Sequence, residues 1–137
     1  MPDTGVHTLN LAVPPDDVDA VHLLLETVWS TFPQVETRDR FCFETALVEL
    51  ASNVIRHADA GSGVRCTIDV AVTAHEICAS LADSGVEFEA GLGPVTMPGE
   101  LEESGRGLAL IQALVTELVY SRDGDVNRWR ITRERAR

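Results

Sequence analysis

The sequence predicts an α+β domain in two layers, with a mixed or antiparallel sheet that carries its helices on one face. Alternating apolar and polar residues indicate strands, for example at residues 6–13 and Val64–Val72. Apolar residues that recur every three or four positions indicate helices. The elements follow in the order strand, helix, helix, strand, strand, helix, strand, strand, and this order is typical of the α+β class.

The first half of the chain contains one predicted strand and two predicted helices. The strand at residues 6–13 ends at a Pro-Pro pair, and Asp16 or Asp17 then offers an N-cap for the first helix. A Phe-Pro break at residues 32–33 separates this helix from the next. The second helix runs from residue 36 or 37 to about residue 58, where a loop rich in Gly and Ser follows.

The second half contains two predicted hairpins and one helix. Val64–Val72 and residues 77–82 alternate on either side of a short polar break, which predicts an antiparallel hairpin. Residues 87–103 are acidic, contain Gly and Pro, and show weak periodicity, so we expect a lid-like loop. A helix is predicted to open at Ser104 and to continue to Leu118. The chain is predicted to finish as a hairpin that turns at an Asp-Gly-Asp sequence.

Composition indicates one folded domain over residues 1–137. The chain is 45% hydrophobic and 24% charged, a balance typical of globular proteins. No apolar run approaches the ~20 residues that span a bilayer, and the N-terminus lacks the basic and apolar blocks of a signal peptide. The three cysteines are widely spaced without a CxxC pattern, so neither a zinc site nor a disulfide framework is expected. These features favour a cytoplasmic protein that does not contact a membrane.

The charge of the chain weighs against nucleic acid as a direct partner. The formal net charge is −11, whereas proteins bind nucleic acid mostly by neutralising phosphates with Lys and Arg. The chain has no lysine, and its basic side chains other than histidine are all arginines. An acidic protein can still hold a nucleotide if backbone N–H groups and a divalent cation meet the phosphates.

The stretch from Glu44 to His57 carries the first candidate site. On a helix, every fourth residue from Thr45 onward is polar, and these residues form one stripe. Within the stripe, Glu49 can accept a proton, and Asn53 one turn later can offer a neutral oxygen to a hard metal ion. A solvated helix face is the alternative, because surface helices commonly show such stripes. The opposite arc is apolar and suited to packing on a sheet, and it consists of Phe43, Leu47, Leu50, Ala51, Val54, Ile55 and Ala58.

Two glycine-containing motifs follow. Asp83-x-Gly85 ends a predicted strand, where a carboxylate can accept a hydrogen bond from an exocyclic amine and glycine admits a flat base. Taken alone, this pattern is also an ordinary strand-to-turn signal. Gly105-x-Gly107 opens a predicted helix, with Ser104 as its N-cap, and free N–H groups at a helix start attract anions. The arginine between the two glycines can aid phosphate binding or point to solvent.

The three motifs, in this order, resemble those of a known family. ELASNVIRH resembles the N box, DSGVEF the G1 box and SGRGLALI the G2 box of the GHKL ATPases, which share the Bergerat fold. The small size and the short lid are most similar to those of anti-sigma-factor serine kinases of the RsbW type. The resemblance covers essentially the whole chain.

The resemblance implies a role for each matched residue. Glu49 would be the general base that polarises the attacking hydroxyl, and Asn53 would hold Mg²⁺ against the phosphates of ATP. Asp83 would read the adenine amino group, with Gly85 packing under the base. The phosphates would be covered by Gly105, Arg106 and Gly107. His57 is either a histidine favoured by the dipole at the end of its helix or a ligand, and we assign it no chemistry.

The resemblance also implies a function and partners. The chain would be an ATP-dependent serine/threonine kinase that phosphorylates an anti-anti-sigma protein of the STAS type and sequesters a sigma factor, and regulators of this type often form homodimers. The G1 box departs from the family at Glu87, where glycine or proline is common, which keeps a second hypothesis open. Under that hypothesis the chain is a binding module that sequesters a partner with weak catalysis or without nucleotide. The ATP-binding half of a histidine kinase is not expected, since no phosphoacceptor helix precedes the domain.

Overall fold

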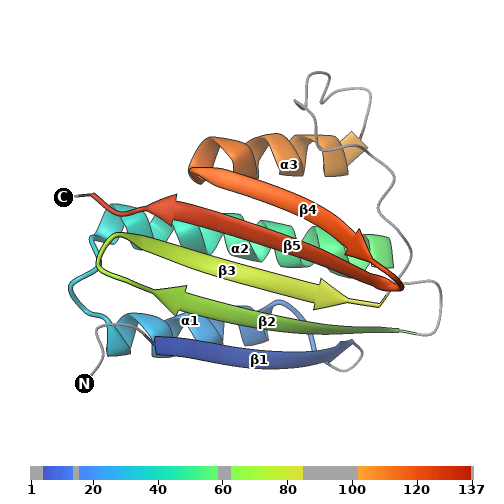
Figure 1. Cartoon of the computed structure of the whole chain (residues 1–137), viewed down its shortest axis with the longest axis horizontal. Helices are drawn as coiled ribbons and strands as arrows, with labels where there is room; N and C mark the ends of the chain where they lie inside the picture. The colour runs from blue at the N-terminus through green and yellow to red at the C-terminus, as the bar shows by residue number, and fades with distance from the viewer. Residues whose placement is uncertain (1–4, 14–15, 59–62, 85–101, 137) are drawn as a thin grey trace.

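The structure is a computed structural model that describes residues 5–13, 16–58, 63–84 and 102–136. Within these ranges the elements follow in the predicted order (Figure 1). They are β1 (Gly5–Val13), α1 (Asp19–Thr31), α2 (Thr37–Ala58), β2 (Val64–Val72), β3 (Glu76–Asp83), α3 (Glu102–Leu114), β4 (Glu117–Asp123) and β5 (Val126–Glu134). The predicted lid lies outside the described residues except for its last two positions, which belong to α3.

The strands form one antiparallel sheet of five strands in the order β1-β2-β3-β5-β4. The pairs β2–β3 and β4–β5 are the two predicted hairpins, and β5 inserts between β3 and β4. In Figure 1, α1 and α2 lie behind the sheet, and α3 lies beside β4. The prediction of a two-layer α+β fold is therefore confirmed, with an antiparallel rather than a mixed sheet.

The core fills the space between the sheet and the helices. Alternate residues of β2 and β3 are buried, as expected for strands with one covered face. α2 covers that face with the predicted apolar arc, and its buried members are Phe43, Leu47, Leu50, Ala51 and Val54. α1 adds its own buried stripe of Val21, Leu25 and Val28.

The predicted N-cap of the first helix is wrong in position. The cap residue is Val18, and its side chain makes no capping hydrogen bond. Asp17 instead accepts a hydrogen bond from the backbone N–H of Asp19 at 2.9 Å, and Asp16 accepts one from the N–H of Ala12 at 2.9 Å. Aspartate readily forms such local turns. The aspartates therefore shape the approach to α1 rather than cap it.

The boundaries of α3 also differ from the prediction. The helix begins at Glu102, so Ser104 lies inside its first turn and is not the N-cap. It ends at Leu114, and Leu118 belongs to β4, opposite Ile131 of β5. Leu118 fits the helical period, since it lies four residues after Leu114. It also fits the two-residue period of a strand, since it alternates with polar neighbours. Pairing with β5 decides in favour of the strand.

A buried ion pair ties three element ends together. Asp39 in the first turn of α2 accepts a hydrogen bond from Nε of Arg133 in β5 at 2.8 Å and another from the N–H of Ala136 at 2.8 Å. Arg133 also donates through Nη1 to the carbonyl of Leu114, the last residue of α3, at 2.7 Å. Asp39 is almost fully buried. This cluster fixes the end of the sheet against both helices.

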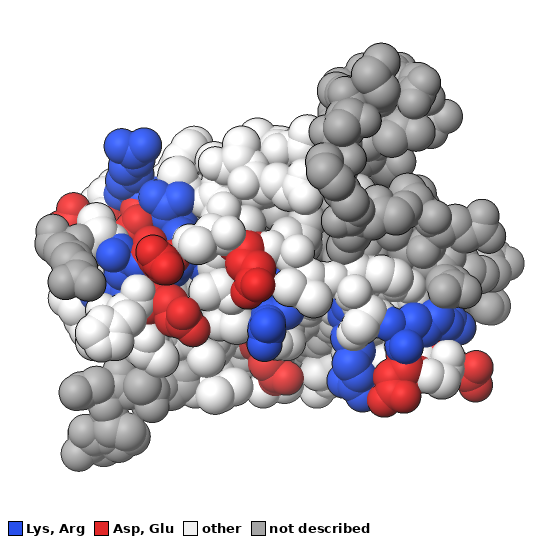
Figure 2. Space-filling model, turned by 45° about the horizontal axis from the view of Figure 1, so that its top comes forward, with Lys and Arg blue, Asp and Glu red and all other residues white. Residues whose placement is uncertain are grey.

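Charged side chains do not gather into one basic patch on the face visible in Figure 2. Arginines and acidic residues lie beside each other there, at the left end and again at the lower right, and Arg130 pairs with Glu117 at 3.8 Å. Among the residues that the structure describes, no helix is long and apolar enough to cross a membrane.

Candidate functional site

The ends of the three elements that carry predicted site residues lie toward one end of the molecule. Figure 1 shows the C-terminal ends of α2 and β3, the N-terminal end of α3 and the turn between β4 and β5 on the same side, at the right. α2 contacts both β3 and α3. Asn53 of α2 and Asp83 of β3 therefore both lie toward this end, although 30 positions separate them in sequence.

Asn53 is buried, with only 4% of its surface exposed. Its Oδ1 accepts a hydrogen bond from Nη2 of Arg56, one turn further along α2. Its Nδ2 is buried and has no hydrogen-bond partner among the described residues. A buried donor without a partner is costly, so a group of this kind calls for an explanation such as a ligand. At Asn53 the alternative of a solvated helix face is wrong.

Glu49 lies one turn before Asn53 and is half-buried. It borders an open hollow of about 340 Å³ between α1 and α2, whose other lining residues are His22, Phe41, Glu44, Thr45 and Val48. Phe41 is 67% exposed, which is unusual for so large an apolar side chain. Glu49 therefore borders an open space beside α1.

Two hydrogen bonds to Glu44 hold α1 against α2 beside this hollow. The Glu44 carboxylate contacts Nδ1 of His22 at 2.7 Å and accepts a hydrogen bond from Nε1 of Trp29 at 3.1 Å. Both partners belong to α1, and the Trp29 ring also packs edge-on against Phe43 of α2. Because the two helices are joined by these contacts, the wall of the hollow has a defined shape.

Asp83 lies at the end of β3 and is only 3% exposed. Its Oδ1 accepts a hydrogen bond from Nδ2 of Asn127 in β5 at 3.0 Å. Oδ1 of Asn127 in turn accepts hydrogen bonds from the hydroxyl of Tyr120 at 2.6 Å and from Nη1 of Arg122 at 2.8 Å. Since Tyr120 and Arg122 are donors at these contacts, they orient the amide so that its NH₂ faces Asp83. The β4–β5 hairpin thus fixes this carboxylate.

Cys66 of β2 lies directly opposite Asp83 in the sheet. Burial, together with the negative charge of Asp83, raises the pKa of the Cys66 thiol to about 12. The thiol therefore stays protonated at physiological pH and acts as a small apolar residue.

The glycine motifs are described only in part. Gly85 and Glu87 lie outside the described residues. Gly105, Arg106 and Gly107 fall within the first two turns of α3, because that helix begins at Glu102. The unpaired N–H groups at the start of a helix belong to the residues around its first turn, and these precede Gly105. Contact between the phosphates and the Gly105–Gly107 stretch stays a prediction.

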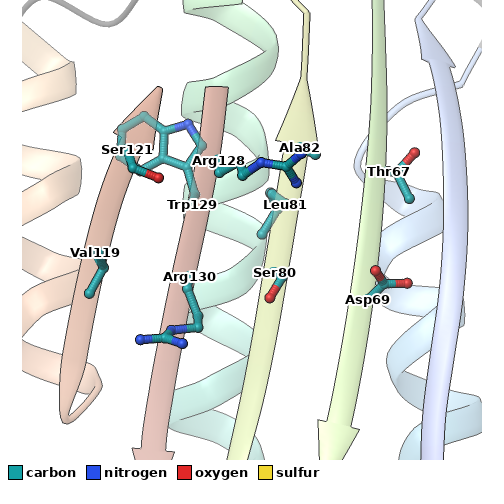
Figure 3. Close-up of a pocket in the computed structure, with 10 residues that line it drawn as sticks. All are labelled: Thr67, Asp69, Ser80, Leu81, Ala82, Val119, Ser121, Arg128, Trp129 and Arg130. Carbon is teal, nitrogen blue, oxygen red and sulfur yellow. The ribbon is translucent and has the colours of Figure 1, made fainter. Parts of the chain in front are cut away.

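A second hollow, of about 360 Å³, lies on the other face of the sheet, away from α2 (Figure 3). Arg128 and Arg130 project over it from β5, while Ser80 and Asp69 line it from β3 and β2. None of the predicted site residues borders this hollow. Its lining is typical of a solvated sheet face rather than of the site that the motifs predict.

The hydrogen bonds of Asn53 and Asp83 involve residues that the motif analysis did not single out. Arg56 could have been recognised, because it lies three residues after Asn53 and such positions are neighbours on a helix. Asn127 carries a weaker signal. It is polar at a position of β5 whose alternating neighbours Trp129 and Ile131 are buried, and polar residues are rare there without a partner.

Comparison with known proteins decides the family. Residues 11–133 match the family model described as histidine kinase-like ATPase domain. The chain belongs to this family. The match spans the N, G1 and G2 boxes and supports the GHKL assignment, so ATP binding with kinase or ATPase chemistry is the class of function to which the domain belongs.

The structure of the Acinetobacter baumannii histidine kinase AdeS resembles this histidine kinase-like ATPase domain over 100% of the present chain and 70% of that chain. The TM-score is 0.52 and the sequence identity is 17%. At this identity, the likeness shows a shared fold. It does not show that the two proteins transfer phosphate to the same kind of acceptor residue. A search of curated proteins gives no significant match.

Proposed function

We propose that this domain is an ATP-dependent serine/threonine protein kinase that also acts as an anti-sigma factor. The observation that carries the proposal is that the N-box residue Asn53 and the G1-box residue Asp83 are both buried toward the same end of a histidine kinase-like ATPase fold. There Asn53 is buried with an unpaired amide nitrogen, and Asp83 is held by Asn127. Both features fit a site that is completed by a bound molecule.

Asp83 would select the adenine base. A carboxylate accepts hydrogen bonds, so it pairs with the exocyclic amino group of adenine. Asn127 holds Oδ1 of this carboxylate from the neighbouring strand, and the carboxylate need not reorganise when the base enters. Gly85 would let the base approach the backbone closely.

Asn53 would hold Mg²⁺. The described residues contain no group of three or more His, Cys, Asp and Glu side chains able to enclose a metal. Mg²⁺ in a nucleotide site takes most of its ligands from phosphates and water and few from protein. When bound, Mg²⁺ would neutralise charge on the phosphates. The amide oxygen of Asn53 is the protein ligand that we assign to it.

Glu49 would act as the general base. The acceptor hydroxyl would give its proton to the Glu49 carboxylate, its oxygen would bond to the γ-phosphorus, and the bond from that phosphorus to ADP would break. The open hollow beside Glu49, with exposed Phe41 on its wall, leaves room for a protein acceptor. Gly105, Arg106 and Gly107 would cover the phosphates from the side of α3.

The acceptor we propose is a serine or threonine of an anti-anti-sigma protein, whose unphosphorylated form competes with a sigma factor for this chain. The small size and the short predicted lid, which are most similar to those of the RsbW type, support this choice. We also propose a cytoplasmic homodimer without direct contact to nucleic acid. The net charge of −11 supports the last point.

Phosphoryl transfer to a purified STAS-type protein tests the proposal. We expect γ-phosphate to move to serine or threonine as an acid-stable ester. Replacing Glu49 by Gln keeps the size of the side chain, so nucleotide binding should persist while transfer falls by about 10²–10⁴-fold. Transfer that survives in Glu49→Gln would remove the base assignment. An acid-labile phosphohistidine product would contradict serine/threonine specificity.

A nucleotide-free binding module is the second candidate, and one contact favours it. The guanidinium of Arg56 already holds the oxygen that Mg²⁺ would need. Under this alternative, capture of a sigma factor would not change when nucleotide is removed. Under the kinase proposal, capture should depend on the nucleotide and on the phosphorylation state of the antagonist.

A further inference from the structure

Arg56 holds the one oxygen of the Asn53 side chain. The Nη2 atom of Arg56 donates to Oδ1 of Asn53, and Nη1 donates to the hydroxyl of Ser52 at 3.2 Å. The other polar atom of the Asn53 amide is a nitrogen that only donates. Arg56 is itself exposed. An exposed cation is thus anchored on a buried amide oxygen.

A magnesium ion and this guanidinium compete for the same place. Arginine keeps its charge at all physiological pH values. Mg²⁺ binds oxygen at about 2.1 Å, and the guanidinium nitrogen lies within hydrogen-bonding distance of the same atom. The two cations would then be within roughly 5 Å of each other. Like charges at that distance repel strongly where water is excluded.

We propose that Arg56 is an internal competitor for the metal position, so that it must release Asn53 before a magnesium–nucleotide complex can bind. The inference rests on the proposed function, since it assumes that Asn53 is the metal ligand. Release is sterically open to Arg56, because the arginine side chain is long and its head lies at the surface. Binding of metal–nucleotide therefore includes the loss of a charge-assisted hydrogen bond.

Removing Arg56 changes the affinity for the magnesium–nucleotide complex, and the sign of this change distinguishes a competitor from a residue that attracts phosphate. A cation that only attracts phosphate would, when removed, weaken nucleotide binding both with and without metal. A competitor would, when removed, tighten binding of the metal complex, although a favourable positive charge is lost. A charge-assisted hydrogen bond corresponds to about a tenfold factor in affinity.

Calorimetry with a non-hydrolysable ATP analogue tests this on the full chain. The analogue is titrated at saturating Mg²⁺ and again with the metal chelated. The proteins are the wild type, Arg56→Leu and the charge-matched control Arg65→Leu. Arg65 is an exposed arginine of β2, on the sheet face away from α2. Thermal unfolding of each protein confirms that it is folded.

We expect Arg56→Leu to lower the Kd of the magnesium complex about tenfold, with no such gain when the metal is chelated. Arg65→Leu should leave both values near those of the wild type. Ser52→Ala, which removes the second anchor of Arg56, should give a smaller gain in the same direction. A Kd at saturating Mg²⁺ that is unchanged or higher in Arg56→Leu would overturn the inference.

The readout is independent of any acceptor protein. If phosphoryl transfer is absent but Arg56→Leu binds the magnesium complex more tightly, the kinase proposal fails and this inference stands. If the wild type does not bind and Arg56→Leu does, competition is supported in its strongest form. If neither protein binds the magnesium complex, both the proposed site and the competitor role are overturned.

Discussion

Asp83 and Asn53 are the two side chains on which the proposed nucleotide site depends, and each is buried with a polar neighbour. Asp83 is held from the adjacent strand by Asn127, whereas Asn53 is held from its own helix by Arg56. The two contacts have opposite consequences. In the proposed site, Asn127 would orient an acceptor for the base, while Arg56 would occupy the oxygen that the metal needs.

Replacing Asn127 by Ala should weaken ATP binding about tenfold, because the Asp83 carboxylate loses a hydrogen bond that orients it. The change also leaves Tyr120 and Arg122 without this acceptor, so the free energy of unfolding should fall by about 1–3 kcal/mol. Tyr120→Phe is the matched control, since it removes one donor but leaves the bond to Asp83 in place. Calorimetry and urea unfolding measure the two effects. Equal ATP affinity in Asn127→Ala and Tyr120→Phe would contradict an orienting role.

The thiol of Cys66 should make the stability of the protein sensitive to alkaline pH. Its pKa is about 12 in the folded chain, against an ordinary value of 9.0. As the pH rises above 9, the unfolded chain therefore releases this proton while the folded chain keeps it. The contribution is fully present below about pH 9 and is lost between about pH 9 and 12, at roughly 1.4 kcal/mol per pH unit.

Urea unfolding at about pH 8 and about pH 10.5 measures this loss. We expect the wild type to lose about 2 kcal/mol more than Cys66→Ala between the two conditions. The quantity compared is the change in unfolding free energy between the two pH values in each protein. This comparison cancels the cost of the smaller side chain and the titration of other groups. An equal loss in both proteins would show that Cys66 ionises as easily in the folded state as in the unfolded state.

At the scale of the elements, α2 has two different faces. Its apolar arc packs in the core, and its polar stripe carries residues of the proposed site. Its apolar arc was readable from periodicity alone, because burial against a sheet imposes the helical repeat. The burial of Asn53 was not readable, since its position on the polar stripe predicts partial exposure. α2 contacts both α3 and β3, and Asn53 is buried in the folded domain. The burial of Asn53 therefore depends on tertiary contacts, which the local sequence pattern does not encode.

The ion pair between Asp39 and Arg133 should be the strongest single polar link between elements. Arg133→Leu removes one partner and leaves a buried carboxylate, so the free energy of unfolding should fall by about 3–5 kcal/mol. Arg130→Leu on the same strand is the matched control, because its pair with Glu117 is exposed and such pairs contribute about 0–1 kcal/mol. Chemical denaturation measures both. Similar losses in the two variants would show that burial of Asp39 does not strengthen its pair.

At the scale of the whole molecule, the described parts of three distant sequence motifs lie toward the same end of the fold. The strands, the order of elements and the antiparallel hairpins could be predicted, since they depend on patterns of period two and on turn residues. The insertion of β5 between β3 and β4 depends on long-range pairing that no local pattern encodes. That insertion brings Asn127 opposite Asp83, which is why the sequence motifs did not include it.

Calorimetric titration of ATP, with and without Mg²⁺, into the wild type and Asn53→Ala tests the central claim most directly. Asn53→Ala removes the proposed metal ligand but leaves Asp83 and its network intact. We predict that Mg²⁺ strengthens ATP binding to the wild type and that Asn53→Ala loses this strengthening. Asp83→Asn should bind poorly in either condition, since an NH₂ donor replaces one of the two acceptor oxygens and Asn127 already engages the other. ATP affinity that is independent of Mg²⁺, or equally dependent on it in Asn53→Ala, would contradict the site.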